Sequence, residues 1–273
     1  MSAAVVEIES SSGLRPLNLR ELATYRELLY FLVWRDIKVR YKHTLLGAAW
    51  AILQPGLTMG VFSLFLGRLA QVPSDGIPYP LFSFAALVPW TYFSAALLNG
   101  SSSIVGSQQL ISKVYFPRLL VPFAAAVTPL VDFSVAMAML FALMAYYHVV
   151  PSPTIVWLPA FLALALASAF AVSLWLATLT VKFRDVRFVV PFAVQFWLFA
   201  TPVAYPASLV PARWRPLYGL NPMTAVVEGF RWALVGGPSP GRMVLPSVIV
   251  IAALLVGGLL YFRQQEGTFA DAA

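Results

Sequence analysis

The chain has 273 residues, of which 60% are hydrophobic and only 11% are charged, and its mean hydropathy is +0.80. Soluble globular proteins carry about 25% charged residues, so this composition excludes an ordinary soluble domain and indicates an integral membrane protein. The formal net charge of +7 does not indicate nucleic-acid binding, because the basic residues gather beside apolar segments, where anionic lipid headgroups are the expected neighbours.

The N-terminal segment is expected to stay on the cytoplasmic side. Residues 1–30 contain acidic residues and lack an apolar core followed by a small-residue cleavage site, so they do not form a signal peptide. Residues 19–34 have the spacing of an amphipathic helix that lies on the membrane surface. Its apolar face would contain Leu22, Tyr25, Leu28, Leu29 and Leu32, and its polar face Arg20, Glu21, Thr24 and Glu27.

A dense group of charges follows this amphipathic segment. In residues 36–42 charged and apolar side chains alternate, which is also the pattern of a strand, but no nearby segment would pair with a strand here. We therefore expect the helix to continue and to end in a turn near Gly47. Arg35, Lys38, Arg40 and Lys42 are placed either to anchor the topology on anionic lipid or to dock a partner, and the two roles are compatible.

Six segments have about the 20 apolar residues that a helix needs to cross a bilayer. They are residues 45–67, 79–98, 119–147, 155–181, 188–203 and 243–262, and Asp132 is the only acidic residue inside them. With the N-terminus inside, most basic residues fall in cytoplasmic positions, which predicts an even number of spans and two cytoplasmic termini. The basic residues between and after the spans on that side are Lys113, Arg118, Lys182, Arg184, Arg187 and Arg263.

Residues 204–242 are rich in proline and are too long for a loop without structure. Asn221-Pro222 is a helix-entry signal, and apolar residues recur after it at helical spacing up to Gly236. We expect short re-entrant helices here, dipping into the outer leaflet between the fifth and sixth spans.

No catalytic motif accompanies these spans. The sequence has no phosphate-binding loop, no metalloprotease or nucleophile-elbow motif, no cysteine, and only two histidines, which lie far apart. Catalysis or metal binding by this chain alone is therefore not expected. An acidic residue inside a span is by default a functional hypothesis, so Asp132 is open to a proton-coupled role. The alternative, that it accepts hydrogen bonds from a neighbouring helix, is favoured because no second charge lies in the spans to build a relay.

Aromatic residues are frequent in the spans and have two interpretations. They are ordinarily lipid-facing or interfacial, or they line a channel in which sugars stack on the rings. The candidates are Trp50, Phe62, Phe65, Trp90, Tyr92, Phe93, Phe196, Trp197 and Phe199.

Several blocks of the sequence, in this order, resemble the permease subunits of type-2 ABC transporters, in the branch that exports bacterial cell-surface polysaccharides such as O-antigen. The blocks begin with WRDIKVRYKHTLLGAAWAILQP and FSLFLGRLAQVPSDGIPYPLFSFAALVPWTYFSAALLNGSSSIVGSQQLISKVYFPRLLVPFAA, and continue with KFRDVRFVVPFAVQFWLFATPVAYP and LNPMTAVVEGFRWAL. The resemblance covers about residues 22–262, and separate blocks in the right order are more specific than a single motif.

The resemblance implies an all-α half transporter with an N-terminal cytoplasmic region (1–44), a six-span permease domain (45–263) and a cytoplasmic tail (264–273) in the bacterial inner membrane. It implies a homodimer around a channel for a lipid-linked polysaccharide. Two copies of a separate cytoplasmic ATPase would bind ATP and Mg²⁺, while this chain binds no cofactor. Alternatives are a type-2 permease for teichoic acid or another lipid-linked or small-molecule cargo, and a proton-coupled carrier or membrane enzyme that uses Asp132.

The same resemblance implies roles for three sets of residues. The ATPase-docking and coupling set is Arg35, Asp36, Lys38, Arg40, Tyr41, Lys113, Tyr115, Phe116 and Arg118. The channel-lining set is Trp50, Phe62, Trp90, Phe196, Trp197 and Tyr205. The periplasmic-gate set is Asn221, Pro222, Glu228, Arg231 and Trp232.

Overall fold

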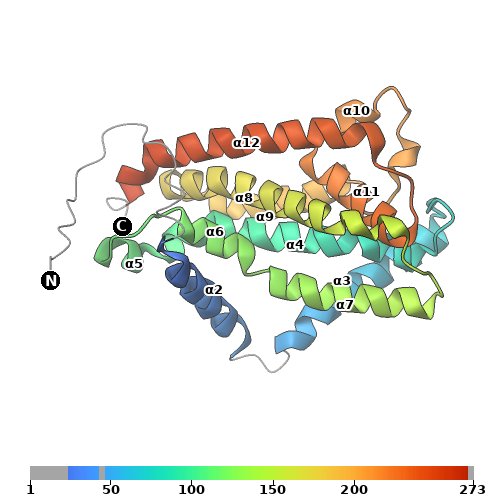
Figure 1. The fold of residues 1–273 in the computed structure, drawn as a ribbon, viewed down its shortest axis with the longest axis horizontal. Helices are drawn as coiled ribbons and strands as arrows, with labels where there is room; N and C mark the ends of the chain where they lie inside the picture. Colours follow the sequence, from blue (N-terminus) through green and yellow to red (C-terminus); the bar gives the residue numbers. More distant parts are fainter. Residues whose placement is uncertain (1–23, 43–46, 270–273) are drawn as a thin grey trace.

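The computed structural model describes residues 24–42 and 47–269, and within these residues the secondary structure is entirely helical (Figure 1). The prediction of an all-α protein is confirmed. The α-helices are α2 (Arg26–Tyr41), α3 (Gly47–Phe62), α4 (Tyr79–Gly106), α5 (Gln108–Lys113), α6 (Leu120–Val127), α7 (Leu130–Tyr146), α8 (Leu158–Lys182), α9 (Val186–Ala200), α10 (Arg215–Tyr218), α11 (Pro222–Val235) and α12 (Val244–Gln265). Shorter 3₁₀ or π turns are η1 (Ser63–Leu69), η2 (Pro153–Trp157), η3 (Ala207–Leu209), η4 (Gly241–Met243) and η5 (Glu266–Phe269).

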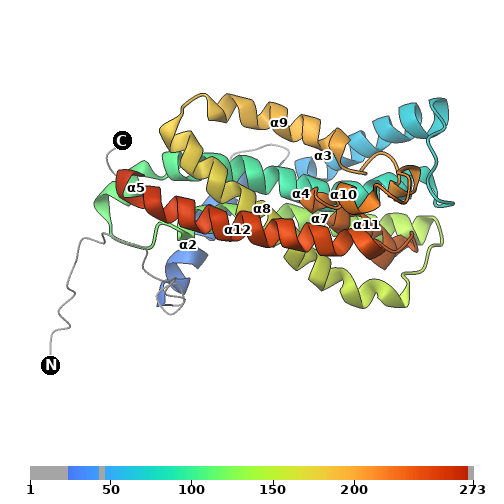
Figure 2. The same cartoon turned by 90° about the horizontal axis from the view of Figure 1, so that it is seen from above.

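Helix α4 is the centre of the bundle. It packs against α8, α11, α6, α7 and α3 (Figure 2). Almost every side chain of its first four turns is buried. A helix that is apolar on all sides is expected to be enclosed by other helices. The crossing of α4 and α8 is close, because Gly100 lies directly against Ser173, whose hydroxyl donates to the carbonyl of Ala96 over 3.4 Å. Small residues at such crossings let helix backbones approach each other in membrane proteins.

Five helical segments of the described chain are long and apolar enough to cross a membrane, which fits a multi-pass membrane protein. They are Ala49–Leu69, Tyr79–Gly106, Leu120–Tyr146, Pro153–Lys182 and Gly241–Gln265. The predicted fifth span, residues 188–203, corresponds to the shorter apolar helix α9. Its 15 residues reach about 22 Å at about 1.5 Å per residue, less than the roughly 30 Å of a bilayer core. The helix ends just before Thr201 and Pro202, since a residue that precedes proline is driven out of the helical conformation.

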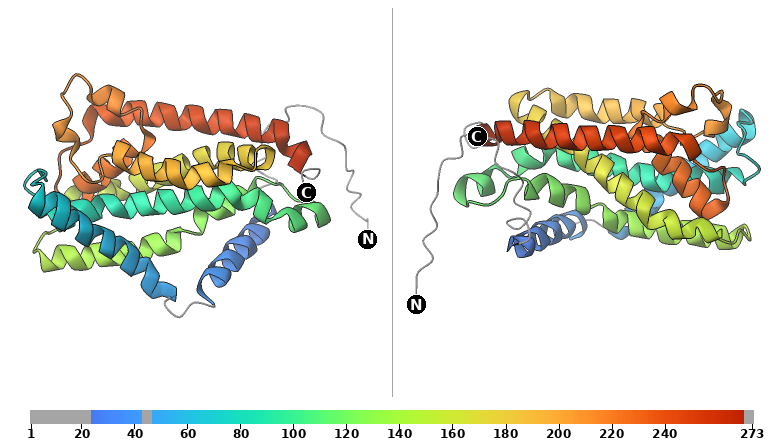
Figure 3. Two further views of the ribbon diagram at one scale, coloured as in Figure 1. Left: turned by 180° about the vertical axis from the view of Figure 1, so that it is seen from behind. Right: turned by 45° about the horizontal axis from the view of Figure 1, so that its top comes forward.

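Helix α2 lies obliquely outside the main bundle (Figure 3). Leu32 is buried, and Tyr25, Leu28 and Leu29 pack beside it against α6 and neighbouring elements, as expected for the apolar face, while Leu22 lies outside the described residues. Helix α2 continues through the charged stretch to Tyr41, so the strand interpretation is wrong. The expected turn near Gly47 falls largely on residues 43–46, outside the described residues, and α3 begins at Gly47.

The two ends of the bundle carry different features. Helix α5 and the last turns of α8 and α12 gather at one end, and α10 and α11 lie toward the other (Figures 1 and 2). We call them the α5 end and the α10 end. Lys113, Lys182 and Arg263, which were predicted to share one side of the membrane, all lie at the α5 end.

Candidate functional site

A groove of 1080 Å³ runs along α4 between α3 and α9, with α7 and the last turn of α2 completing its walls. Aromatic and aliphatic side chains dominate its surface, and amide and hydroxyl groups are interspersed among them. The aromatic residues are Tyr41, Trp50, Phe62, Trp90, Tyr92, Phe133 and Phe199, and the polar uncharged ones include Gln54, Thr58, Thr91, Ser94, Asn99 and Gln195. Such a surface offers both ring faces and hydrogen-bonding groups to an elongated molecule.

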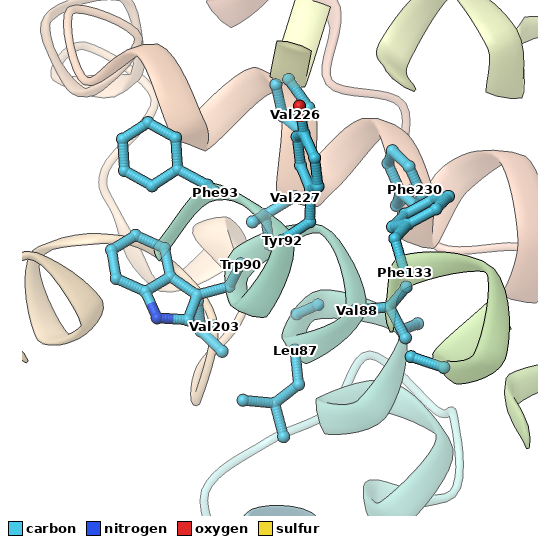
Figure 4. Close-up of a cluster of buried hydrophobic side chains, with 14 of the residues drawn as sticks. Leu87, Val88, Trp90, Tyr92, Phe93, Phe133, Val203, Val226, Val227 and Phe230 are labelled. Atoms are coloured by element: carbon cyan, nitrogen blue, oxygen red, sulfur yellow. The ribbon is translucent and has the colours of Figure 1, made fainter. Parts of the chain in front are cut away.

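The floor of the groove belongs to the protein core. Trp90 is only 4% exposed, and Tyr92 and Phe133 meet edge to face with ring centroids 5.8 Å apart (Figure 4). Trp50 on the opposite wall is 53% exposed. The floor is therefore held rigidly by core packing, while the α3 wall presents its side chains openly.

The structure places half of the predicted channel-lining residues in this groove. Trp50, Phe62 and Trp90 line it. Phe196, Trp197 and Tyr205 are not among its lining residues, and their assignment to a channel stays a prediction.

Each of those three side chains has other surroundings. Phe196 is 62% exposed and stacks obliquely on Phe192 of the same helix. The indole N–H of Trp197 donates to Asn221 over 2.9 Å. The Tyr205 hydroxyl lies 2.6 Å from that of Tyr218.

The sequence reasoning did not single out the amides of Gln54 and Gln195. Both occur inside otherwise apolar helices and face the groove. Amide side chains within apolar spans are uncommon, because their polar groups need partners there, so their presence was a usable signal.

The predicted docking residues of α2 form two groups. Arg35 pairs with its neighbour Asp36 over 2.8 Å, and the ammonium of Lys38 lies 5.4 Å from the centre of the Trp34 ring. Lys38 is exposed, and the Arg35 and Asp36 side chains are 38% and 32% exposed, so a partner can reach them. Arg35 and Asp36 also line a hollow between α2, α4 and α6. Arg40 and Tyr41 instead turn toward α7.

Asp132, in the first turn of α7, binds both of these α2 residues. One carboxylate oxygen accepts from the Arg40 guanidinium over 2.9 Å, and the other accepts from the Tyr41 hydroxyl. Burial raises the pKa of Tyr41 to about 12, and the hydrogen bond to Asp132 acts in the same direction, so the phenol keeps its proton and donates. The prediction that Asp132 accepts hydrogen bonds from a neighbouring helix is confirmed. Its charged partner, Arg40, comes from α2 and not from one of the predicted spans.

The coupling residues between α4 and α6 are divided between surface and core. Lys113 and Tyr115 are exposed, whereas Phe116 is buried. The Arg118 guanidinium donates to the backbone carbonyl of Glu266 in the C-terminal tail. Phe269 of the same tail is 1% exposed and packs on Phe262. The described part of the tail, Glu266–Phe269, thus belongs to the α5 end.

The predicted periplasmic-gate residues lie in and around α11, of which every residue except Trp232 is buried. Asn221 caps this helix by accepting from the amide of Met223 over 3.1 Å, and Pro222 occupies the first helical turn. Trp232 packs edge to face on Phe161. Their gating role stays a prediction.

Glu228 and Arg231 form a buried ion pair of 3.0 Å, with side chains that are 3% and 1% exposed. The guanidinium also donates to the carbonyls of Phe82, Pro202, Val203 and Tyr205, and it lies 3.6 Å from the centre of the Phe82 ring. The second partner of Glu228 is the amide of Ala207, at 3.1 Å. This arrangement, which we call the Arg231 cluster, ties α11 to α4 and to the segment that follows α9.

Known proteins resemble this chain over most of its length. The family model described as ABC-2 type transporter matches residues 27–235. An O-antigen export system permease protein RfbA of Myxococcus xanthus is 32% identical over 255 residues, covering 91% of this chain and 96% of that protein. A protein of the same description from Klebsiella pneumoniae is 25% identical, covering 90% and 94%. The polysialic acid transport protein KpsM of Escherichia coli is 24% identical, covering 85% and 91%. The chain therefore belongs to the ABC-2 type transporter family.

Proposed function

We propose that the chain is the channel-forming permease subunit of an ATP-driven exporter that moves a lipid-linked cell-surface polysaccharide, such as O-antigen, across the bacterial inner membrane. The observation that carries the proposal is the long groove with aromatic rings and amides. A glycan presents C–H faces that stack on such rings and hydroxyls that bond to amides. The likeness to permeases named for O-antigen export and polysialic acid transport supports this class of cargo.

A homodimer is the expected working unit. One copy does not fully enclose the groove, so a second copy facing it would complete a channel between two grooves. The α3 wall supports this, because its Trp50 side chain is 53% exposed and can meet a partner helix. Apolar side chains that face neither core nor water are suited to lipid or to another subunit.

The proposed topology has six crossings, with both termini in the cytoplasm. Helix α9 would be the fifth crossing, completed by the residues at its ends, and α10 with α11 would be re-entrant from the periplasmic side. The basic residues at the α5 end support this orientation, since Lys and Arg favour the cytoplasmic side. The short length of α9 is compatible with local thinning of the bilayer around it.

Energy would come from two copies of a separate cytoplasmic ATPase, which bind ATP and Mg²⁺. Arg35 and Lys38 of α2, with Lys113 and Tyr115 at the α5 end, form the proposed docking surface. Lys38, Lys113 and Tyr115 are exposed and the Arg35 side chain is 38% exposed. The surface is mostly basic, which suits an acidic protein surface or anionic lipid. A pull-down of the ATPase with the double variant Arg35→Glu/Lys38→Glu distinguishes docking of the ATPase from binding of anionic lipid. If these residues dock the ATPase, its recovery should fall. If they only anchor the chain to lipid, its recovery should stay unchanged.

The function is tested by replacing the chain in its own bacterium with single tryptophan variants. Trp50→Ala removes an exposed ring from the groove, and Trp157→Ala removes an equally exposed ring from η2, away from the groove. An aromatic contact contributes about 0.5–1.5 kcal/mol, so Trp50→Ala should lower surface glycan about two- to tenfold, and Trp157→Ala should not. Equal glycan in both variants and in a deletion strain would exclude glycan export and direct attention to another lipid-linked cargo.

A further inference from the structure

We infer that Asp132 is a positioning residue for export, whose carboxylate fastens the end of α2 to the wall of the groove so that movement of α2 reaches the groove. The inference rests on the proposed function, because the docked ATPase is the source of that movement. It concerns three side chains, Arg40, Tyr41 and Asp132, which we call the α2 latch.

The latch uses both oxygens of one carboxylate. Arg40 occupies one oxygen at 2.9 Å and Tyr41 the other. Hydrogen bonds require a defined distance and direction, so two of them on one carboxylate fix where the end of α2 lies relative to α7. A change in the angle of α2 must either carry α7 with it or break the latch.

The rest of α2 is held in a different way. Its middle packs through Leu32, which is 1% exposed, into an apolar cluster that also contains Leu120 and Val121 of α6. Apolar contact has no preferred direction, so it permits the helix to tilt while staying attached. The apolar cluster therefore acts as the pivot, and the latch, more than two turns further along α2, is the point that moves most.

The position of the latch links it to the groove. All three of its residues line the groove of 1080 Å³. Arg40 also lines a second hollow of 430 Å³, which lies between α2, α4 and α6. Asn99 of α4 likewise lines both the groove and this second hollow. Arg40 thus stands on the boundary between the two spaces, and displacing it changes the shape of the groove at that point.

The latch is built to break and form again. The Arg40 and Asp132 side chains are 43% and 22% exposed, so neither charge is enclosed by protein on all sides. Asp132 also lies in the first turn of α7, where the helix dipole favours a negative charge. By contrast, a group that only held two helices together would be expected to be buried, as the Arg231 cluster is.

The test measures export and ATP hydrolysis separately in the full transporter. Asp132→Asn is compared with Asp75→Asn, which removes a carboxylate that bonds to Ser208 in the loops of the α10 end. Surface glycan is measured in cells, and phosphate release and ATPase recovery are measured on the purified complex in proteoliposomes. We expect Asp132→Asn to lower glycan export about tenfold at near-normal ATP hydrolysis, as loss of a charge-assisted bond suggests, and Asp75→Asn to leave both unchanged.

Further variants keep the inference testable if Asp132→Asn assembles poorly. The quantity compared is the ratio of glycan exported to ATP hydrolysed. Tyr41→Phe deletes one hydroxyl and should lower this ratio by about threefold. The exchange Arg40→Asp/Asp132→Arg should restore part of that ratio. Wild-type export in both Asp132→Asn and Tyr41→Phe would overturn the inferred role of the α2 latch. The same conclusion would follow if assembly fell in parallel with export and the exchange restored neither. A deletion strain with unaltered surface glycan would instead overturn the proposed function.

Discussion

Replacing Arg231 should destabilise the α10 end more than any other single change. The variant Arg231→Met keeps the length of the side chain but removes every polar interaction of the Arg231 cluster. It leaves Glu228 charged and 3% exposed, with only the amide of Ala207 as a partner. It also removes the hydrogen-bond donor of the four backbone carbonyls that accept from Arg231.

Removing one partner of a buried ion pair costs about 3–5 kcal/mol, because the remaining charge stays in a medium of low polarity. Unsatisfied carbonyls add to this cost, though not in full, since neighbouring groups rearrange. Even the lower value is a large part of the 5–15 kcal/mol that stabilises a typical domain. At about 2–4 °C per kcal/mol for a protein of this size, Tm should fall by about 6–20 °C.

The assay is thermal unfolding of the purified chain in detergent, followed by intrinsic tryptophan fluorescence. Arg242→Met is the matched control, because Arg242 is an exposed arginine in η4 at the same end of the bundle, and its Tm should change little. The double variant Glu228→Gln/Arg231→Met should recover part of the loss, since no isolated charge remains buried. A Tm for Arg231→Met equal to that of Arg242→Met would refute the reasoning.

Two further changes test helix packing and the C-terminal tail. Gly100→Ala should lower the free energy of unfolding by about 1–3 kcal/mol, because the new methyl group overlaps Ser173. Gly106→Ala is the control and should be neutral or stabilising, because no atom lies within 4 Å of the new methyl group. Equal Tm values in thermal unfolding of the two variants would contradict the close crossing of α4 and α8. Deleting residues 266–273 removes the contact to Arg118 and the buried Phe269. Amide hydrogen exchange of α5 should therefore accelerate, and recovery of the ATPase should fall. Unchanged exchange would show that the tail does not support α5.

The sequence was sufficient for those parts of the fold that depend on local composition. Long apolar runs located five membrane-length helical segments, because the thickness of a bilayer sets a minimum number of apolar residues. The start of α11 was legible in Asn221-Pro222, where a capping side chain and a proline act within one turn. The end of α9 was harder to place, since Pro191 lies inside the helix while Pro202 follows its end.

The parts that the sequence left open depend on contacts between distant segments. Asp132 was recognisable as unusual, but its partner Arg40 is 92 positions away and belongs to a run of several equivalent cations. Glu228 and Arg231 are three positions apart, a spacing typical of a helix pair on the surface, and only the tertiary fold reveals that they are buried. The burial of Phe269 likewise depends on the α5 end being assembled.

The Arg231 cluster and the α2 latch differ in how their charges are held, and this difference suggests where movement enters the molecule. At the α10 end, Arg231 is completely enclosed and bound by four carbonyls and a carboxylate, so displacing it would expose a charge to an apolar surrounding. In the α2 latch, Arg40 and Asp132 are 43% and 22% exposed, and Arg40 borders the second hollow beside Asn99, so this pair is less enclosed than the Arg231 cluster. The groove runs along residues 87–99 of α4, whose buried side chains resist deformation. A force applied to α2 should therefore reshape the α3 and α7 walls of the groove, while α4 and α11 stay fixed.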